Sequence, residues 1–259
     1  NISFRFEHAE ALGIVGSGGA GKTTLLQLIT GLEKPYSGTV LANDEDIHRK
    51  NFSLTRLRQK VGLVFQFPES QLFEVTVGED VAFGPRNLGL RENEIQHRTE
   101  EALQAMELPT SHFFTRDIHH LSQGEKRRVA IAGVLAMQPE VLVLDEPTAG
   151  LDPHAARQLI AILQKLRSDH GHGLIVVSHD IEFLAEIIDR VIVLEHGRLV
   201  LDFRLCDLAA MEDRLPANVP LPRPLRLSRH LQTLGIALPA PALTKVNLLH
   251  TLEKFLESA

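Results

Sequence analysis

The sequence predicts an α/β fold with a mostly parallel sheet, an inserted helical region and a small C-terminal appendage. Two apolar runs, VLVL at 141–144 and LIVV at 174–177, are typical of buried strands. Between them, Ile160, Leu163 and Leu166 mark the apolar side of an amphipathic helix over 155–167. Because apolar strands that alternate with helices usually pair in parallel, we expect both runs in one parallel sheet.

The same patterns place the other elements. We expect helices over Thr24–Ile29, where Gly31 ends the helix, and throughout Val77–Met137. The further expected strands are a strand–turn–strand over Phe4–Val15, Thr39–Leu41, Val61–Phe65, and Val191–Leu194 paired through a turn at 195–197 with Leu199–Leu201.

The composition of the chain changes after Phe203. Prolines at 216, 220, 222 and 224 indicate a stiff linker, and amphipathic segments follow at 227–234 and 243–256. We therefore expect a main domain over residues 1–203, with a core of 1–73 and 138–203 and a helical subdomain of 74–137. The Pro-rich linker and helical extension occupy 204–259.

Bulk composition excludes several classes of protein. The 259 residues are 44% hydrophobic and 23% charged, as in an ordinary globular protein, and the net charge of −6 gives no electrostatic footprint for nucleic acid. The single cysteine, Cys206, excludes an internal disulfide. No apolar run approaches the roughly 20 residues that span a bilayer. Since Asn1 lies only a few residues before the first motif strand, we expect natural N-terminal residues to be missing.

The segment GSGGAGKTT, residues 16–24, fits two phosphate-binding motifs. Its glycines spell the dinucleotide motif G-x-G-x-x-G, and residues 16–23 spell the P-loop G-x-x-x-x-G-K-[ST]. Only the P-loop needs a lysine for the β- and γ-phosphates and a hydroxyl for Mg²⁺, which Lys22 and Thr23 supply. The dinucleotide motif needs an acidic residue about 20 residues later, and Glu33 comes too early. The segment therefore predicts a nucleoside-triphosphate site.

Polar groups for such a site follow two of the expected strands. Asp145 and Glu146 end the 141–144 strand, where one carboxylate can help to hold Mg²⁺ and the other can polarise a water molecule. His179 follows the 174–177 strand, where we expect it to face the γ-phosphate.

The segment LSQGEKRR, residues 121–128, opens another expected helix. A serine such as Ser122 is usually a helix cap, although a helix N-terminus also attracts phosphate. The run Lys126–Arg128 after it is typical of a solvated helix face.

Together these segments resemble, over Phe4–Leu201, the motifs of ABC transporter ATPases in the order of that family. They match Walker A at 16–23, the Q-loop glutamine Gln66, the signature at 121–125, Walker B ending at Asp145, the catalytic glutamate Glu146, the D-loop at 149–152 and the switch histidine His179. The resemblance implies a P-loop NTPase with a RecA-like core sheet, an antiparallel β part and the inserted helical subdomain.

The resemblance also implies ATP and Mg²⁺ as cofactors, and ATP-driven dimerisation with a second ATPase subunit. Glu146 would orient the attacking water, His179 would hold it in line, and Gln66 would report the nucleotide state. Thr23, Gln66 and, through water, Asp145 would hold Mg²⁺. Ser122 and the Gly124 backbone would contact the ATP of the partner subunit. The implied nucleotide-binding residues are Gly16, Ser17, Gly18, Gly19, Ala20, Gly21, Lys22, Thr23, Thr24, Ser122, Gly124 and Asp152.

A narrower resemblance covers VFQFPESQLFEVTVGEDVAFGPRNLGL, Val64–Leu90, which is similar to ATPase subunits of energy-coupling factor (ECF) transporters, including the cobalt and nickel type. It implies import of a vitamin or transition-metal ion, and a peripheral place on the cytoplasmic face of the cell membrane. The implied partners are a transmembrane coupling subunit and a substrate-binding membrane protein, without nucleic acid, and the ATPase pair is either a homodimer or a heterodimer. The alternatives are the ATPase of another ABC transporter and, less well supported, a soluble ABC ATPase.

Two departures from the family pattern affect the expected site. The usual Gly-Gly-Gln of the signature reads Gln123-Gly124-Glu125, and the new carboxylate either weakens ATP binding or caps the helix. Because the backbone N–H of Gln123 survives, we expect a competent site. The aromatic residue that stacks on adenine in the family would lie before Asn1.

Overall fold

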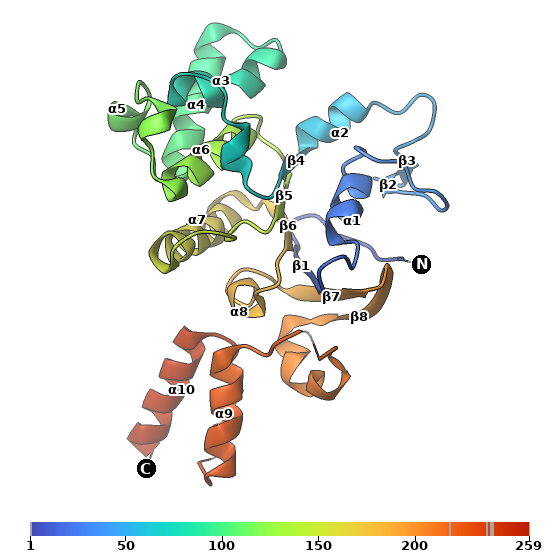
Figure 1. The fold of residues 1–259 in the computed structure, drawn as a ribbon, viewed down its shortest axis with the longest axis vertical. Helices are drawn as coiled ribbons and strands as arrows, with labels where there is room; N and C mark the ends of the chain where they lie inside the picture. Colours follow the sequence, from blue (N-terminus) through green and yellow to red (C-terminus); the bar gives the residue numbers. More distant parts are fainter. Residues whose placement is uncertain (1, 218, 237, 239–240, 259) are drawn as a thin grey trace. The chain divides into compact units, whose positions relative to one another are not determined.

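The computed structural model describes residues 2–217, 219–236, 238 and 241–258, which form two compact units. Unit 1 comprises Asn1–Phe6, Ala11–Lys22 and Ser178–Ala259, and unit 2 comprises Glu7–Glu10 and Thr23–Val177. Each unit contains strands and helices of the α/β fold that the sequence predicts (Figure 1). Among the described residues, no helix is both long and apolar enough to cross a membrane.

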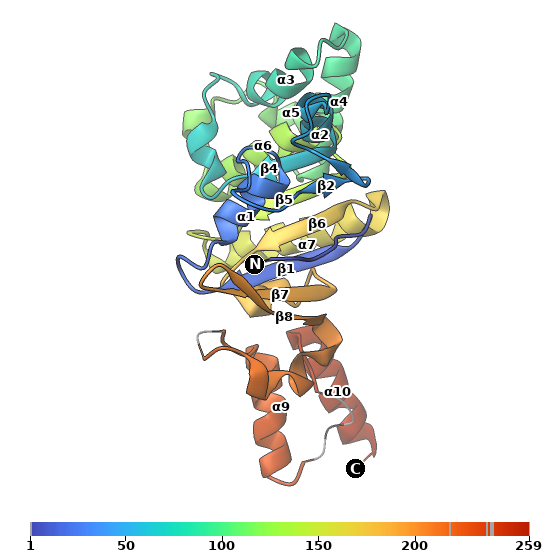
Figure 2. The same cartoon turned by 90° about the vertical axis from the view of Figure 1, so that its right-hand side faces the viewer.

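Three parallel strands form the sheet of unit 2 (Figure 2), in the order β4 (Val61–Val64), β5 (Val141–Asp145) and β6 (Gly173–Val177). The interior of β5 is fully buried, as the continuous apolar run predicts for a strand covered on both faces. Because all three strands run the same way, their carboxyl ends share one edge. Gln66 follows β4 at that edge, and Asp145 and Glu146 lie there at the end of β5.

Unit 2 also contains many helices, and those from α3 to α6 gather in one group (teal to green in Figure 1). Val81, Leu103 and Ile131, from three of these helices, are fully buried and form its core. The helical prediction for 77–137 is therefore confirmed. The bounds are α1 (Lys22–Ile29, which begins at the last residue of a unit 1 segment), α2 (Leu54–Lys60), η1 (Pro68–Gln71), α3 (Val77–Asn87), α4 (Glu92–Ala105), α5 (Thr110–Phe113), η2 (Ile118–His120), α6 (Gln123–Leu135) and α7 (Pro153–His170).

A separate two-stranded hairpin, β2 (Leu41–Ala42) and β3 (Glu45–Asp46), forms the antiparallel part of unit 2. Its turn residues Asn43 and Asp44 have φ of +51° and +64°, the conformation of a tight hairpin turn that Asn and Asp tolerate best. The expected strand at Thr39–Leu41 is thus shifted toward the turn, because the turn residues set where pairing begins.

The sheet of unit 1 consists of β1 (Ala11–Gly16), β7 (Arg190–Glu195) and β8 (Arg198–Arg204). β1 and β7 are parallel, and β8 returns antiparallel through a turn at His196 and Gly197, as expected. The first half of the expected strand–turn–strand is wrong, because no strand precedes β1 among residues 2–10. There the Arg5 carbonyl accepts a hydrogen bond from the Arg190 side chain at 2.8 Å. This is a side-chain contact and not the backbone pairing of a strand.

The C-terminal part of unit 1 is helical, as the amphipathic segments predict. After α8 (Ile181–Leu184) and the β7–β8 hairpin, the chain forms η3 (Leu205–Ala210), η4 (Glu212–Arg214), α9 (Arg223–Thr233) and α10 (Lys245–Ser258). Leu238, Ala242 and Leu248 form a small apolar core against which side chains of α9 and α10 pack. Glu182 of α8 accepts hydrogen bonds from the backbone and side chain of Arg223 at 3.1 and 3.0 Å. The domain boundary at 203/204 stays a prediction.

Candidate nucleotide site

The glycine-rich loop after β1 has the backbone of a phosphate cradle. Gly16, Gly19 and Gly21 have φ of +156°, +75° and +97°, which favour glycine over residues with a Cβ. A Cβ on Gly16 would lie 2.3 Å from the Leu194 carbonyl oxygen, whereas Gly18 has open space around it. The loop is therefore packed at its base and open along its rim, where backbone N–H groups can approach an anion.

Lys22 closes this loop from the start of α1. Its ammonium donates to the carbonyl oxygens of Gly16 and Ser17 at 2.9 and 3.0 Å, so the side chain curls back over the loop. Ala20 is buried, and its N–H donates to the Ser17 carbonyl at 3.1 Å, which makes the turn. This arrangement holds a positive charge beside the cradle, as the P-loop motif predicts.

In unit 2, the hydroxyl of Thr23 donates to a carboxylate oxygen of Asp145 at 2.8 Å. Residues 122 positions apart are thus joined, because β5 carries Asp145 to the first turn of α1. Asp145 is 4% exposed, so this residue has little contact with solvent. A hydroxyl and a carboxylate in contact are a donor set that fits Mg²⁺, a cation that prefers oxygen ligands. Gln66 lies exposed just after β4, and no hydrogen bond joins it to either residue within the described structure.

Glu146 occupies a strained turn directly after β5. Its φ of +48° is unusual for a residue with a side chain and costs of order 1–3 kcal/mol. Its N–H donates to the Val177 carbonyl at 2.9 Å, and its own carbonyl accepts from the Ala149 N–H at 3.1 Å. Glu146 is 9% exposed, so the turn fixes a largely buried carboxyl group beside Asp145.

Asp152, at the end of the same turn segment, caps α7. Its Oδ1 accepts from the N–H groups of His154 and Ala155 at 2.8 and 3.0 Å. The hydrogen bond from Ala155, followed by that from His154, lowers the pKa of the exposed Asp152 carboxyl. Its expected nucleotide contact stays a prediction.

Ser122 and Glu125 form a reciprocal cap at the start of α6. The Ser122 hydroxyl accepts from the Glu125 N–H at 3.3 Å, and the Glu125 carboxylate accepts from the Ser122 N–H at 2.7 Å. Arg116 adds an ion pair to Glu125 at 3.0 Å. Burial alone raises the pKa of Glu125, but the hydrogen bonds from Ser122 and the charge of Arg116 bring it below its ordinary value. Of the two expected roles of Glu125, the structure shows the helix cap.

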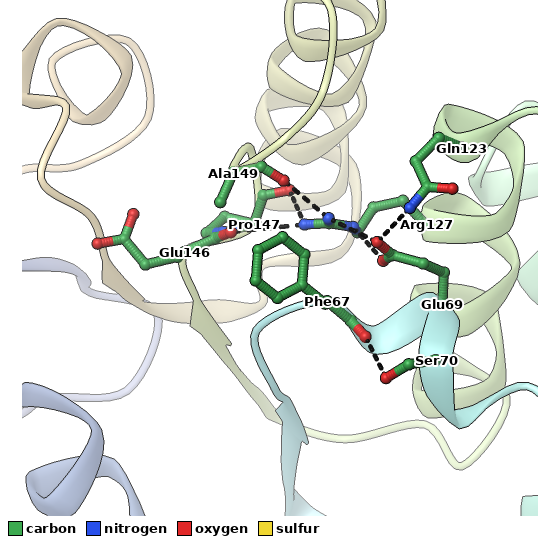
Figure 3. A network of polar contacts seen from close by, with 8 residues as sticks. All are labelled: Phe67, Glu69, Ser70, Gln123, Arg127, Glu146, Pro147 and Ala149. Carbon is green, nitrogen blue, oxygen red and sulfur yellow. Dashed lines mark hydrogen bonds and ion pairs between the residues drawn. The ribbon is translucent and has the colours of Figure 1, made fainter.

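The expectation of a solvated Lys126–Arg128 face is wrong for Arg127, whose side chain is fully buried. It donates to the Glu69 carboxylate at 2.8 Å and to the carbonyls of Pro147 and Ala149 at 2.8 and 2.9 Å (Figure 3). A charge run predicts exposure only on average, and the partners of Arg127 lie far away in the sequence. The single local signal is the apolar stretch after it, VAIAGVL, which requires most of α6 to be buried.

In unit 1, His179 stands exposed at the corner between β6 and α8. The fully buried Ser178 before it accepts from the Asp180 N–H at 3.0 Å, and the Ser178 N–H donates to the Ile14 carbonyl at 3.3 Å. Asp180 then caps α8 through bonds from the N–H groups of Glu182 and Phe183. The backbone of the corner is thus fixed on both sides of the exposed His179.

Comparison with known proteins identifies the family. The sequence model of the ABC transporter family matches residues 1–149, which is more than half of the chain. The chain belongs to the ABC transporter family. This ABC protein is 41% identical over 236 residues to the energy-coupling factor transporter ATP-binding protein EcfA2 of Clostridium perfringens, covering 91% of the chain and 83% of that relative. It is 44% identical over 234 residues to EcfA of Methanothermobacter thermautotrophicus, covering 88% of the chain and 74% of that relative.

Solved structures agree with this placement of the ABC protein. It is similar to cbiO1 from Clostridium perfringens, described as part of the ABC transporter complex cbiONQ, with a TM-score of 0.75 and 38% identity over 82% of this chain and 84% of that one. It is also similar to the dimeric ATP-binding cassette MJ0796 bound to ADP and Pi, with a TM-score of 0.69 and 31% identity over 79% of this chain and 89% of that one. The predicted P-loop ABC ATPase fold is therefore confirmed.

Proposed function

We propose that this ABC protein is the ATP-binding and hydrolysing subunit of an energy-coupling factor importer that takes up a vitamin or a transition-metal ion. Relatives at 41–45% identity carry the name of energy-coupling factor ATP-binding proteins. The observation that carries the chemistry is the contact between Thr23 and Asp145, with Glu146 in a fixed turn beside it. This set of residues is what Mg-ATP hydrolysis on a P-loop requires.

Different residues of the site bind the phosphates, hold Mg²⁺ and orient the water. Backbone N–H groups of Gly16–Thr24 surround the phosphates, and the Lys22 ammonium leaves its two carbonyl partners for the β- and γ-phosphates. Thr23 and Gln66 would hold Mg²⁺, with Asp145 acting through water, and the ion would supply positive charge against the negative charge that develops on the phosphates. Glu146 accepts a hydrogen bond from the attacking water, and His179 fixes the γ-phosphate.

A second ATPase subunit completes each site. Ser122, the Gly124 N–H and Asp152 of one subunit approach the ATP held by the other, so ATP joins the pair and hydrolysis releases it. The dimeric structure of the cassette MJ0796, in a post-hydrolysis state bound to ADP and Pi, supports a second ATPase subunit. The protein itself lies peripherally on the cytoplasmic face of the membrane, held by a transmembrane coupling subunit that works with a substrate-binding membrane protein.

The test compares ATP hydrolysis by the wild type and by Glu146→Gln, while light scattering reports the mass with and without Mg-ATP. We expect hydrolysis by the wild type and a trapped ATP-bound dimer for the variant. Full-rate hydrolysis by a monomer, unchanged in Glu146→Gln, would refute the mechanism. Copurification with membrane proteins of the host supports the importer, whereas stimulation by nucleic acid would favour a soluble ABC ATPase.

A further inference from the structure

One buried guanidinium joins three segments of unit 2 that are far apart in the sequence. Arg127 of α6 contacts Glu69 of η1 and the turn that follows β5 (Figure 3). Its side chain is fully buried, and that of Glu69 is 7% exposed. A buried charge is retained only where its hydrogen bonds are satisfied, so this pair is fixed in place by its surroundings.

The guanidinium binds the backbone of the turn at Glu146 as well as its counterion, which it contacts through Nε at 2.8 Å and Nη2 at 3.2 Å. Nη1 donates to the Pro147 carbonyl at 2.8 Å and at longer range, 3.4 Å, to the Glu146 carbonyl, and Nη2 donates to the Ala149 carbonyl at 2.9 Å. The Glu146 carboxylate itself points away from Arg127 (Figure 3). Arg127 therefore holds the backbone on one side of Glu146, and the Glu146 carboxylate lies on the other side (Figure 3).

The counterion side of the network is strained as well. Phe67, two residues before Glu69, has φ of +53°, and the centroid of its ring lies 5.8 Å from the guanidinium carbon of Arg127. Both Phe67 and Glu146 thus have left-handed backbones, and both flank the same side chain. Strained residues persist only where the surrounding contacts over-determine them, and Arg127 is the contact that they share.

We propose that Arg127 is a positioning residue for Glu146 and that Glu69 sets the place of Arg127. The inference rests on the proposed function, because it concerns the carboxylate that orients water. Glu69 also accepts from the Gln123 amide at 2.7 Å, so one of the two residues that depart from the family signature belongs to the same network. A displacement of the segment 66–71 would thereby reach Glu146 through one side chain.

The test uses Arg127→Lys and Glu69→Gln in the full chain. Lysine keeps the charge but lacks the planar fork that reaches several acceptors at once. We expect its kcat to fall about tenfold to a hundredfold, the cost of a small misplacement of a catalytic group, with the Kd for a fluorescent ATP analogue unchanged. Glu69→Gln should show a smaller loss of kcat, because Arg127 keeps its carbonyl acceptors.

A second readout separates positioning from general stability. In the Glu146→Gln background, Arg127→Lys should leave the residual rate unchanged, because the group that it positions is gone. The matched control is Arg98→Lys, which alters another helical ion pair of unit 2, with Glu94 at 2.6 Å, outside the network. We expect its kcat to equal that of the wild type.

The inference is overturned if both network variants keep wild-type kcat, if the loss is the same with and without the Glu146 carboxylate, or if it lies in ATP affinity alone. If Arg127→Lys does not fold, Glu69→Gln decides by the same criteria. Absence of hydrolysis by the wild type would instead refute the proposed function. Failure of the positioning role and failure of the proposed function therefore give different results.

Discussion

Substitutions of Ser122 separate its two roles, helix cap and phosphate contact. Ser122→Ala removes a capping bond that is long, at 3.3 Å, and exposed, while the shorter bond from the Ser122 N–H to Glu125 survives. We therefore expect a loss at the low end of the range for caps, about 0.5–1 kcal/mol. For a chain of this size, that lowers the Tm by about 1–4 °C.

Ser122→Asp should keep the helix cap but disrupt the phosphate contact. Aspartate caps a helix as well as serine does, so the Tm should stay near the wild-type value. Its carboxylate, however, would face the γ-phosphate of the partner's ATP. Two unit charges about 4 Å apart repel by about 4 kcal/mol at an effective dielectric of 20, which is enough to dissociate the ATP-bound dimer.

The assays are thermal unfolding and light scattering with Mg-ATP, in the Glu146→Gln background that traps the dimer. The chain offers a matched control in Ser53, which caps α2 through a bond of the same length, 3.3 Å, from the Arg56 N–H. Ser53→Ala should match the Tm loss of Ser122→Ala, and Ser53→Asp should dimerise normally. Normal dimerisation of Ser122→Asp would refute the phosphate contact, and a much larger loss for Ser122→Ala than for Ser53→Ala would refute the cap estimate.

Two further predictions concern stability. Gly16→Ala should lower the free energy of unfolding by about 2 kcal/mol or more, because its Cβ would lie 2.3 Å from the Leu194 carbonyl oxygen. Gly18→Ala, whose Cβ would have nothing within 4 Å, should unfold at the wild-type denaturant midpoint. Equal midpoints for the two variants would contradict the packing at Gly16. Glu125 has a lowered pKa, so its stabilisation is present above its ordinary pKa and is lost as the pH falls through the folded value. Glu125→Gln keeps the capping box, and its unfolding free energy should therefore fall less than that of the wild type below about pH 4; parallel pH profiles would show that Glu125 contributes nothing there.

The sequence by itself determined the elements whose cause is local. The apolar run at 141–144 predicts β5 because a strand covered on both faces needs apolar residues throughout. The glycines and Lys22 of the P-loop predict its conformation, because positive φ and a nearby ammonium are properties of a few adjacent residues. The serine at 122 likewise predicts the start of α6, since a cap acts within three residues.

The tertiary structure alone decided the contacts of Arg127. The resemblance to the family motifs predicted that Thr23 and Asp145 share a magnesium site although they are 122 residues apart, whereas Arg127 meets Glu69 across 58 residues, a contact that no pattern in the sequence encodes. The charge run at 126–128 therefore predicted a solvent-exposed Arg127, whereas the fold surrounds its guanidinium with three backbone carbonyls and a carboxylate. Burial of a charged group depends on whether the folded chain brings enough acceptors to it, and only the packing of α6 against η1 and the turn after β5 supplies them.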